Sequence, residues 1–298
     1  MTRILLLGGG GQVGRELRVY LGELGELIAF GRAELDLADE PAIRAAVQRI
    51  RPELIVNAAA YTAVDAAEQD AANAAAINSE AVRALAEEAA ALGARLVHYS
   101  TDYVFDGEKS APYEESDATK PLGVYGASKL AGEEAIASSG AKHLILRTSG
   151  VYSHAAGNFV TTIRRAAATQ PELRVVNDQA GSPTWARTIA QVTCAVARQW
   201  RATGDTRLGI YHLASKGAPT RHALAVKIVE LAHARGETRL TPDRVKAIRT
   251  EDLPAKGARR PRYSALSSAK LERDFAVEIP AWDEDLVRYF AAADSVSG

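Results

Sequence analysis

Two side chains that together can move a proton lie four positions apart in the sequence. Tyr125 and Lys129 occur in the segment Tyr-Gly-Ala-Ser-Lys, and a spacing of four places them on the same face of a helix. A free tyrosine has a pKa of about 10, and an adjacent ammonium lowers that pKa by favouring the phenolate. Such a tyrosine can protonate a carbonyl oxygen while hydride arrives at the carbonyl carbon. The spacing alone is also typical of an ordinary exposed helical turn.

A hydroxyl that binds the same carbonyl is expected upstream, where a strand ends. The residues from Val97 to Gly107 read VHYSTDYVFDG. Either Ser100 or Thr101 can donate a hydrogen bond to a substrate oxygen. Neighbouring residues of a strand point to opposite faces, and this alternation does not by itself decide which of the two hydroxyls faces a substrate.

A glycine-rich turn near the N-terminus is suited to a dinucleotide. The apolar run Ile4–Leu7 leads into Gly8, Gly11 and Gly14, and a helical pattern follows. Glycine permits a tight turn and a close approach of the backbone to a pyrophosphate, and the helix N-terminus supplies free N–H groups and partial positive charge. The spacing is Gly-x-x-Gly-x-x-Gly rather than the commoner Gly-x-Gly-x-x-Gly. Its position directly after the first strand favours binding over a merely flexible turn.

The end of the second expected strand bears on which cofactor is bound. Many NAD-binding domains have an acidic residue there, which holds the ribose 2′-hydroxyl. This chain has Arg32 instead, which can meet the 2′-phosphate of NADP or can be a solvated surface arginine. Asp36 is a candidate acceptor for the adenine amino group.

These residues need a scaffold, and the first half of the chain alternates short apolar runs with longer amphipathic ones. This alternation predicts an α/β fold, a doubly wound parallel sheet of the Rossmann type. Ligands of such sheets bind at the carboxyl ends of the strands. Strands are expected at 4–7, 27–30, 54–58, 95–100 and 143–147, and helices at 12–24, 40–49, 70–92 and 125–138.

The second half is less regular and predicts a smaller C-terminal substrate-binding domain. We expect a cofactor domain over 1–150, with returning segments from about 175–215, and a substrate-binding part over about 151–298. Further strands are expected at 173–176 and 210–213, and helices at 188–200, 221–235 and 283–293, with a loop over 259–282.

Composition narrows the class of protein. A net charge of −1 over 298 residues argues against a nucleic-acid partner. No apolar run reaches the roughly 20 residues that cross a bilayer, so we expect a soluble cytoplasmic protein without a membrane partner. The one cysteine, Cys194, fits a reducing compartment. No residues have the spacing of a zinc site, so no metal ligands are assigned.

With these residues in view, the chain resembles the extended short-chain dehydrogenases, and within them the dTDP-4-dehydrorhamnose reductase family. The resemblance spans nearly the whole length. The segments that carry it are the glycine turn with Gln12, the run Asn57–Asp65 with Glu68, Ser100–Gly107, Tyr125 with Lys129, Asn177–Gln179 with Gly181, Pro183 and Thr184, and the late Arg260-Pro261 with Ser264 and Leu266.

The resemblance implies a reaction and roles for residues. A reduced nicotinamide would deliver hydride to C4 of dTDP-4-dehydro-β-L-rhamnose and give dTDP-L-rhamnose. Thr101 rather than Ser100 would be the catalytic hydroxyl, Tyr125 the acid and Lys129 its partner. The cofactor would be NADPH, with NADH also accepted, and some relatives are homodimers bridged by Mg²⁺. Cofactor contacts would come from Gly8, Gly11, Gln12, Val13, Gly14, Arg32, Asp36, Leu37, Ala58, Ala59, Ala60, Tyr61, Tyr125 and Lys129, and substrate contacts from Val64, Asp102, Tyr103, Gly150, Asn158 and Arg260.

One departure from the family concerns the sugar. The family has a tryptophan where this chain has Gly150, in Arg-Thr-Ser-Gly-Val-Tyr. Loss of an indole removes a large contact and opens space beside the sugar. A neighbouring side chain can fill that space. Alternatively, the sugar binds differently and hydride reaches the opposite face, which would give the C4 epimer, dTDP-6-deoxy-L-talose.

Two other functions remain to be weighed. A nucleotide-sugar epimerase or dehydratase of the same superfamily is one, although dehydratases carry an acidic pair after the catalytic hydroxyl and this chain has Asp102-Tyr103. A non-catalytic regulatory subunit, similar to the beta subunit of methionine adenosyltransferase, is the other. The intact Thr101, Tyr125 and Lys129 argue against it. His98, within an expected strand, is interpreted as a core residue rather than a base.

Overall fold

The computed structural model describes residues 2–155, 157–203, 207–254 and 257–293. A six-stranded sheet with the order β2-β1-β3-β4-β5-β7 forms its larger part, and every neighbouring pair of strands is parallel. The predicted doubly wound sheet is therefore confirmed. The strands are β1 (Arg3–Leu7), β2 (Glu26–Phe30), β3 (Leu54–Asn57), β4 (Arg95–Thr101), β5 (Lys142–Thr148) and β7 (Gly209–His212).

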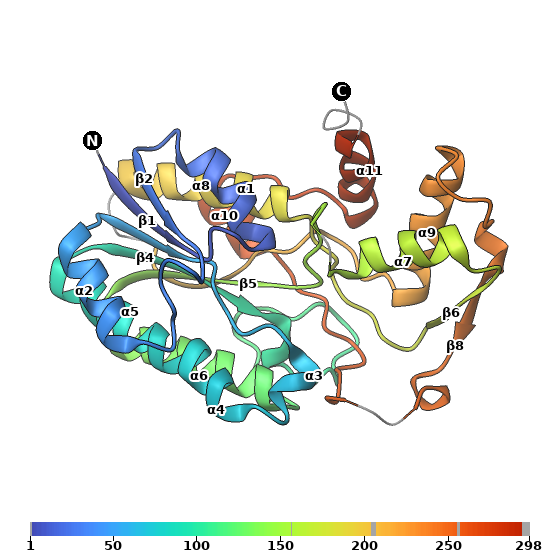
Figure 1. Cartoon of the computed structure of the whole chain (residues 1–298), viewed down its shortest axis with the longest axis horizontal. Helices are drawn as coiled ribbons and strands as arrows, with labels where there is room; N and C mark the ends of the chain where they lie inside the picture. Colours follow the sequence, from blue (N-terminus) through green and yellow to red (C-terminus); the bar gives the residue numbers. More distant parts are fainter. Residues whose placement is uncertain (1, 156, 204–206, 255–256, 294–298) are drawn as a thin grey trace.

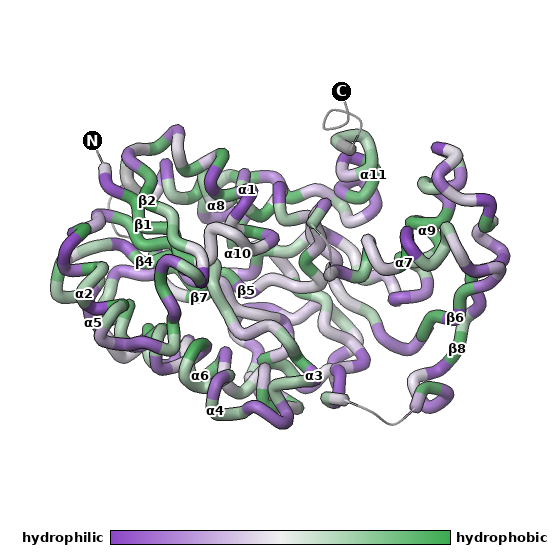
Figure 2. Tube along the Cα trace, viewed as in Figure 1, coloured by the Kyte–Doolittle hydropathy of each residue, from purple (hydrophilic) through white to green (hydrophobic). Residues whose placement is uncertain are grey.

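Helices cover both faces of this sheet (Figure 1). Apolar side chains of the strands are fully buried beneath them, as expected for a parallel sheet. One face packs against α1 (Gln12–Leu21), α8 (Ala186–Thr203) and α10 (Ala269–Phe275), and the other against α2 (Glu40–Ile50), α5 (Ala81–Leu92) and α6 (Val124–Ser138). Figure 2 shows the hydrophobic residues along β1 and β2 and many hydrophilic ones along the connecting segments.

A second, smaller core lies beyond the carboxyl ends of the strands. It is built around a two-stranded parallel sheet of β6 (Leu173–Val176) and β8 (Val245–Ile248), with α7 (Phe159–Thr169), α9 (Arg221–Ala234) and α11 (Trp282–Ala293). Of the expected returning segments, β7 joins the large sheet and α8 packs on one face of it, whereas β6 pairs with β8 instead. The remaining short elements are α3 (Val64–Ala67), α4 (Ala71–Ala75), η1 (Ala76–Glu80), η2 (Asp102–Val104), η3 (Pro242–Arg244) and η4 (Thr250–Asp252).

Two expectations from the sequence differ from the structure. The loop expected over 259–282 contains α10, because Leu271 and Phe275 are buried against the large sheet. The single helix expected over 70–92 is interrupted by a π-helical turn, η1. A π turn of this kind occurs frequently at functional sites, and here it moves one asparagine, Asn78, into the interior.

Candidate active site

Tyr125 stands in the first turn of α6, at the carboxyl end of the large sheet. The helix begins there because Val124 N donates to Glu68 Oε1 at 2.9 Å. The ring of Tyr125 lies edge-on to that of Tyr103, with 5.8 Å between centroids. Burial raises the pKa of Tyr125, the nearby charge of Asp102 raises it further, and a hydrogen bond with Thr101 acts in the opposite direction. The phenol is therefore held protonated, the state that an acid needs.

Lys129 follows one turn later and is almost completely buried. Its Nζ donates to the Tyr99 carbonyl oxygen at 2.6 Å and lies 3.0 Å from His98 Nε2. Burial lowers the pKa of Lys129 to about 8, against a smaller raising effect of Glu133. The ammonium is thus easily deprotonated, and its hydrogen bonds run to β4 rather than to Tyr125.

Thr101, the last residue of β4, lies between the tyrosine and a buried carboxylate. Its hydroxyl donates to Asp102 Oδ1 at 3.0 Å and accepts from Tyr103 N at 3.1 Å. Ser149 donates to the other carboxylate oxygen of Asp102 at 2.9 Å. Burial raises the pKa of Asp102 and hydrogen bonds from neighbouring hydroxyls lower it. The carboxylate orients Thr101 toward the site of Tyr125.

A cavity of about 810 Å³ adjoins these residues and has the features of a dinucleotide site. Gly11 precedes α1 as its N-cap and offers no side-chain acceptor, so the first N–H groups of the helix are left without a side-chain cap. A Cβ at Gly14 would lie 2.0 Å from the Gly8 carbonyl oxygen, so only glycine allows this close turn. The cavity is lined by Gly8, Gly11, Gln12, Val13, Arg32, Asp36, Leu37, Ala58, Ala59, Ala60, Tyr61, Tyr125 and Lys129, among others.

Two buried hydroxyls in this cavity fit a polar ligand. Ser100 Oγ and Thr148 Oγ1 are buried without a hydrogen-bond partner, and both residues line the cavity. Leaving such groups unpaired is costly, so a ligand with hydrogen-bonding groups suits the site. The structure thus brings the predicted cofactor residues together around this cavity. The exception is Gly14, which packs against Gly8 within the glycine turn and does not line the cavity.

Asn78 links the cofactor cavity to α6 from the π turn. Its Oδ1 accepts from Tyr61 N at 2.9 Å, and its Nδ2 donates to Tyr61 O and to Ser128 Oγ, both at 3.0 Å. The asparagine thus fixes the loop after β3 and the helix that carries Tyr125 in one network.

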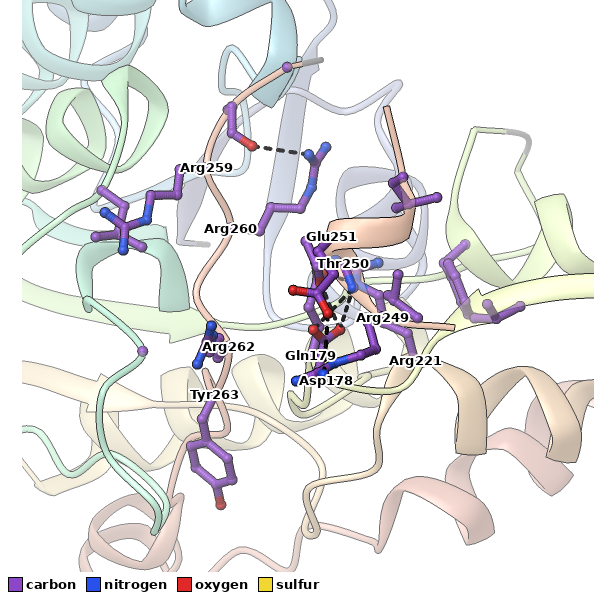
Figure 3. A pocket seen from close by; sticks show the side chains of 18 of the residues that line it. Asp178, Gln179, Arg221, Arg249, Thr250, Glu251, Arg259, Arg260, Arg262 and Tyr263 are labelled. Atoms are coloured by element: carbon purple, nitrogen blue, oxygen red, sulfur yellow. Dashed lines mark hydrogen bonds and ion pairs between the residues drawn. The ribbon is translucent and has the colours of Figure 1, made fainter. Parts of the chain in front are cut away.

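A second cavity, of about 1400 Å³, opens between the two cores and is rich in arginine. Figure 3 shows Arg259, Arg260 and Arg262 along one extended segment, with Arg221 and Arg249 in the group across from it. The Arg221 Nε donates to Gln179 Oε1 at 2.9 Å. Guanidinium groups in this number suit a phosphate-bearing ligand.

A small cavity of about 100 Å³ adjoins the arginine-rich cavity, with which it shares Arg221. Asp102, Tyr103, Gly150, Phe159 and Arg221 are among the residues that line it. Gly150 has a φ of +55°, and a Cβ there would lie 3.0 Å from Pro183 Cα. The backbone at this position therefore disfavours any larger residue, tryptophan included. Space beside the predicted sugar site is preserved.

Other predicted substrate residues have structural partners of their own. Asn158 caps α7 and donates to Gln12 Oε1 at 2.9 Å, which ties the smaller core to the glycine turn. Arg260 pairs with Asp65 at 2.8 Å, and this ion pair lowers the pKa of Asp65. Val64 lies near Tyr103 and Tyr125 at a narrow pocket.

Sequence reasoning did not single out Arg221, Arg249 or Asn57. Arg221 had a weak signal, since it opens a helix after Thr220, whose side chain caps it. Arg249 follows β8, a strand that the sequence pattern did not predict. Asn57 belongs to one of the runs that carry the family resemblance, but its contact with His98 depends on the pairing of β3 with β4.

Comparison with known proteins identifies the family. The family model for the RmlD substrate binding domain matches residues 1–295. A dTDP-4-dehydrorhamnose reductase from Burkholderia thailandensis is 44% identical over 284 residues, which is 94% of this chain and 95% of that protein. The chain belongs to the dTDP-4-dehydrorhamnose reductase family.

Solved structures of family members have the same fold. That of the reductase from Clostridium acetobutylicum aligns with a TM-score of 0.90 and 33% identity, over 98% of this chain and 100% of that chain. That of the reductase from Bacillus anthracis, in complex with NADP, aligns with a TM-score of 0.89 and 32% identity, over 98% and 99%. A nicotinamide cofactor is therefore a property of a close structural relative.

Two further observations concern metals and membranes. Among the described residues, no group of three or more histidine, cysteine, aspartate or glutamate side chains is arranged to hold a metal ion, and the Mg²⁺ that the resemblance suggested finds no support. Within the same part of the chain, every helix is too short or too polar to span a bilayer.

Proposed function

We propose that this chain reduces the C4 ketone of dTDP-4-dehydro-β-L-rhamnose to dTDP-L-rhamnose with NADPH. The observation that carries the proposal is the position of Tyr125, between a cavity suited to a dinucleotide and an arginine-rich cavity suited to a nucleotide diphosphate. Membership in the reductase family supports it. We further propose that the enzyme works in the cytoplasm, in keeping with its single free cysteine, Cys194.

In this proposal the chain divides its work between two parts. Residues 1–150, together with α8 and β7, hold the cofactor, and the part over 151–298 holds the nucleotide. Arg32 is exposed at the rim of the cofactor cavity, where it meets the 2′-phosphate of NADPH. NADH, which lacks that phosphate, binds through the remaining contacts, with Asp36 at the adenine.

The chemistry assigned to the protein is proton transfer and orientation. A reduced nicotinamide, when bound, supplies the hydride for C4. Tyr125 donates its proton to the carbonyl oxygen, and the hydroxyl of Thr101 turns from Asp102 Oδ1 to donate a hydrogen bond to the same oxygen. Lys129 stabilises the tyrosinate that is left. The raised pKa of Tyr125 keeps it protonated before the reaction.

The arginine-rich cavity binds the diphosphate in this proposal. Arg260 then exchanges its pairing with Asp65 for the ligand, while Arg221 approaches from the first turn of α9. Tyr103 and Gly150 border the sugar, together with Asp102 and Val64.

The test is consumption of NADPH with enzymatically prepared dTDP-4-dehydro-L-rhamnose, with the product sugar identified by NMR. We expect rhamnose. The talose epimer would show that Gly150 permits the opposite presentation of C4, and the proposed product would be wrong. An absence of turnover would favour a regulatory subunit, despite the intact catalytic set. The variant Tyr125→Phe should lower kcat by at least ~10²-fold with little change in cofactor binding.

A further inference from the structure

His98 is a buried titratable group that the proposed reaction does not use. It lies on β4 with no exposed surface, and both of its ring nitrogens have partners. Nδ1 is 3.1 Å from Asn57 Nδ2, and Nε2 is 3.0 Å from Lys129 Nζ. A neutral imidazole has one donor nitrogen and one acceptor nitrogen, so the contact on one side fixes the contact on the other.

The orientation of Asn57 decides which nitrogen carries the proton. Ala59 N–H donates to Asn57 Oδ1 at 3.1 Å, and a backbone N–H can only donate. The amide nitrogen of Asn57 must therefore be the atom that faces His98, and it donates to Nδ1. The proton of a neutral His98 is consequently on Nε2, where it points at Lys129.

A donor aimed at Lys129 requires an acceptor there. An ammonium has three hydrogens and no lone pair, whereas a neutral amine can accept. The Nζ of Lys129 can accept from His98 Nε2–H and still donate to the Tyr99 carbonyl oxygen. The imidazolium form of His98 is opposed by burial, which lowers the pKa of His98, and by the Asn57 amide, which faces Nδ1 as a donor and cannot accept from Nδ1–H.

We propose that His98 is a positioning residue for Lys129: fixed by Asn57 with its proton on Nε2, it favours the neutral amine of Lys129 in the cofactor-free enzyme. Lys129 is then charged only when its amine turns from His98 toward the cofactor and Tyr125. This inference rests on the role given to Lys129 in the proposed function. It adds a reason, besides burial, for that amine to titrate near neutrality.

The other groups around Lys129 do not supply this effect. Glu133, one turn further along α6, raises the pKa of Lys129, but it is bound by Arg147 of β5 at 2.6 Å. The hydroxyl of Tyr99 points away, to Thr193 of α8. Tyr125 on α6 is protonated and Asn78 on η1 is neutral, so His98 is the titratable group in direct contact with Nζ.

The first test needs no substrate. The ¹⁵N chemical shifts of the His98 imidazole, in cofactor-free protein labelled at histidine, report which nitrogen carries the proton. We expect a protonated Nε2 and an unprotonated Nδ1. In Asn57→Asp the carboxylate accepts from Nδ1–H, so the proton should move to Nδ1. A proton on Nδ1 in the unaltered protein would overturn the proposal, whatever substrate the enzyme reduces.

The second test is the alkaline limb of the pH profile of kcat/KM for NADPH, which reports groups of the cofactor-free enzyme. Asn57→Asp and His98→Gln both allow an acceptor to face Lys129, so its ammonium should persist to higher pH. The pKa of the alkaline limb should therefore rise by ~1 pH unit or more. His212→Gln is the matched control, because His212 is equally buried on β7 but bonds the Tyr113 carbonyl oxygen. An unchanged limb in both folded variants would overturn the proposal, and so would an equal shift in the control.

Discussion

At the scale of single residues, the site depends on hydroxyls and amines whose hydrogen bonds are already fixed. Thr101 is held by Asp102 and Tyr103 N, and Lys129 by His98 and the Tyr99 carbonyl oxygen. Each group must exchange one of these bonds to act: the single O–H of Thr101 turns from Asp102 to the substrate oxygen, and the amine of Lys129 turns from His98. Their chemistry should therefore be sensitive to small changes in side-chain type.

The variant Thr101→Val should lower kcat/KM by about 10²-fold, because it removes the hydroxyl but keeps the shape. Thr101→Ser keeps the hydroxyl and should lose less than ~10-fold. Steady-state kinetics with the keto sugar measures both. Equal losses in the two variants would mean that the methyl group, not the hydroxyl, is what the site needs.

A second prediction at this scale concerns Gly150 and stability. Gly150→Ala places a Cβ at positive φ and 3.0 Å from Pro183 Cα, and the left-handed backbone alone costs about 1–2 kcal/mol. Gly140→Ala is the matched control, since Gly140 has a φ of +76° with nothing within 4 Å of the added Cβ. Denaturant unfolding should show the larger loss of unfolding free energy for Gly150→Ala. Equal losses would mean that Pro183 moves aside without cost.

At the scale of elements, the π turn η1 connects cofactor binding with catalysis. Because η1 adds a residue to a helical turn, Asn78 points inward and bonds both the loop after β3 and α6. A regular helix over the same residues would present a different side chain at this point.

Replacing Asn78 by Ala should destabilise the protein by about 2–3 kcal/mol, since it leaves buried partners without hydrogen bonds. It should also weaken NADPH binding, because Tyr61 lines the cofactor cavity. Asn73→Ala is the control: Asn73 is exposed on α4 and bonds only Asp70 among the hydrogen bonds of its side chain in the described residues. Thermal unfolding and fluorescence titration measure the two effects. If the two variants lost the same stability and the same affinity for NADPH, the hydrogen bonds of Asn78 would not link cofactor binding to α6.

At the scale of the whole molecule, the arginine-rich cavity exists only because two cores meet. Arg221 and Arg249 come from the smaller core and its surroundings, and Arg260 and Arg262 from the late segment that crosses between the cores. An anionic ligand in this cavity would give these guanidinium groups a shared partner.

Arg221→Met should raise KM for the nucleotide sugar by about 10-fold, because it removes a charge but keeps much of the side-chain volume. It should change kcat by less than ~3-fold. The effect should shrink as ionic strength rises, since salt screens charges. Arg165→Met is the control, an exposed arginine on α7 outside the residues that line the cavity. An unchanged KM would place the diphosphate elsewhere.

The sequence by itself determined the large parallel sheet, the strands of that sheet and most of the helices that cover it. Those follow from local patterns: apolar runs such as Ile4–Leu7, amphipathic helices, and a glycine turn whose backbone requirements can be read from residue type. The sequence also predicted the pair Tyr125 and Lys129, because a spacing of four residues in a helix places both side chains on one face.

Only the tertiary structure decided which side chains meet across distant segments. Phe275, which the sequence pattern placed in a loop, lies in α10 because its packing against the large sheet outweighs the weak helical preference of the local sequence. The contact of Asn57 with His98 requires the register of β3 on β4, and the arginine-rich cavity requires two cores to face one another. Such contacts are set by long-range pairing and burial, which no local pattern contains, and so the sequence predicted the acid but not the groups that tune its partner.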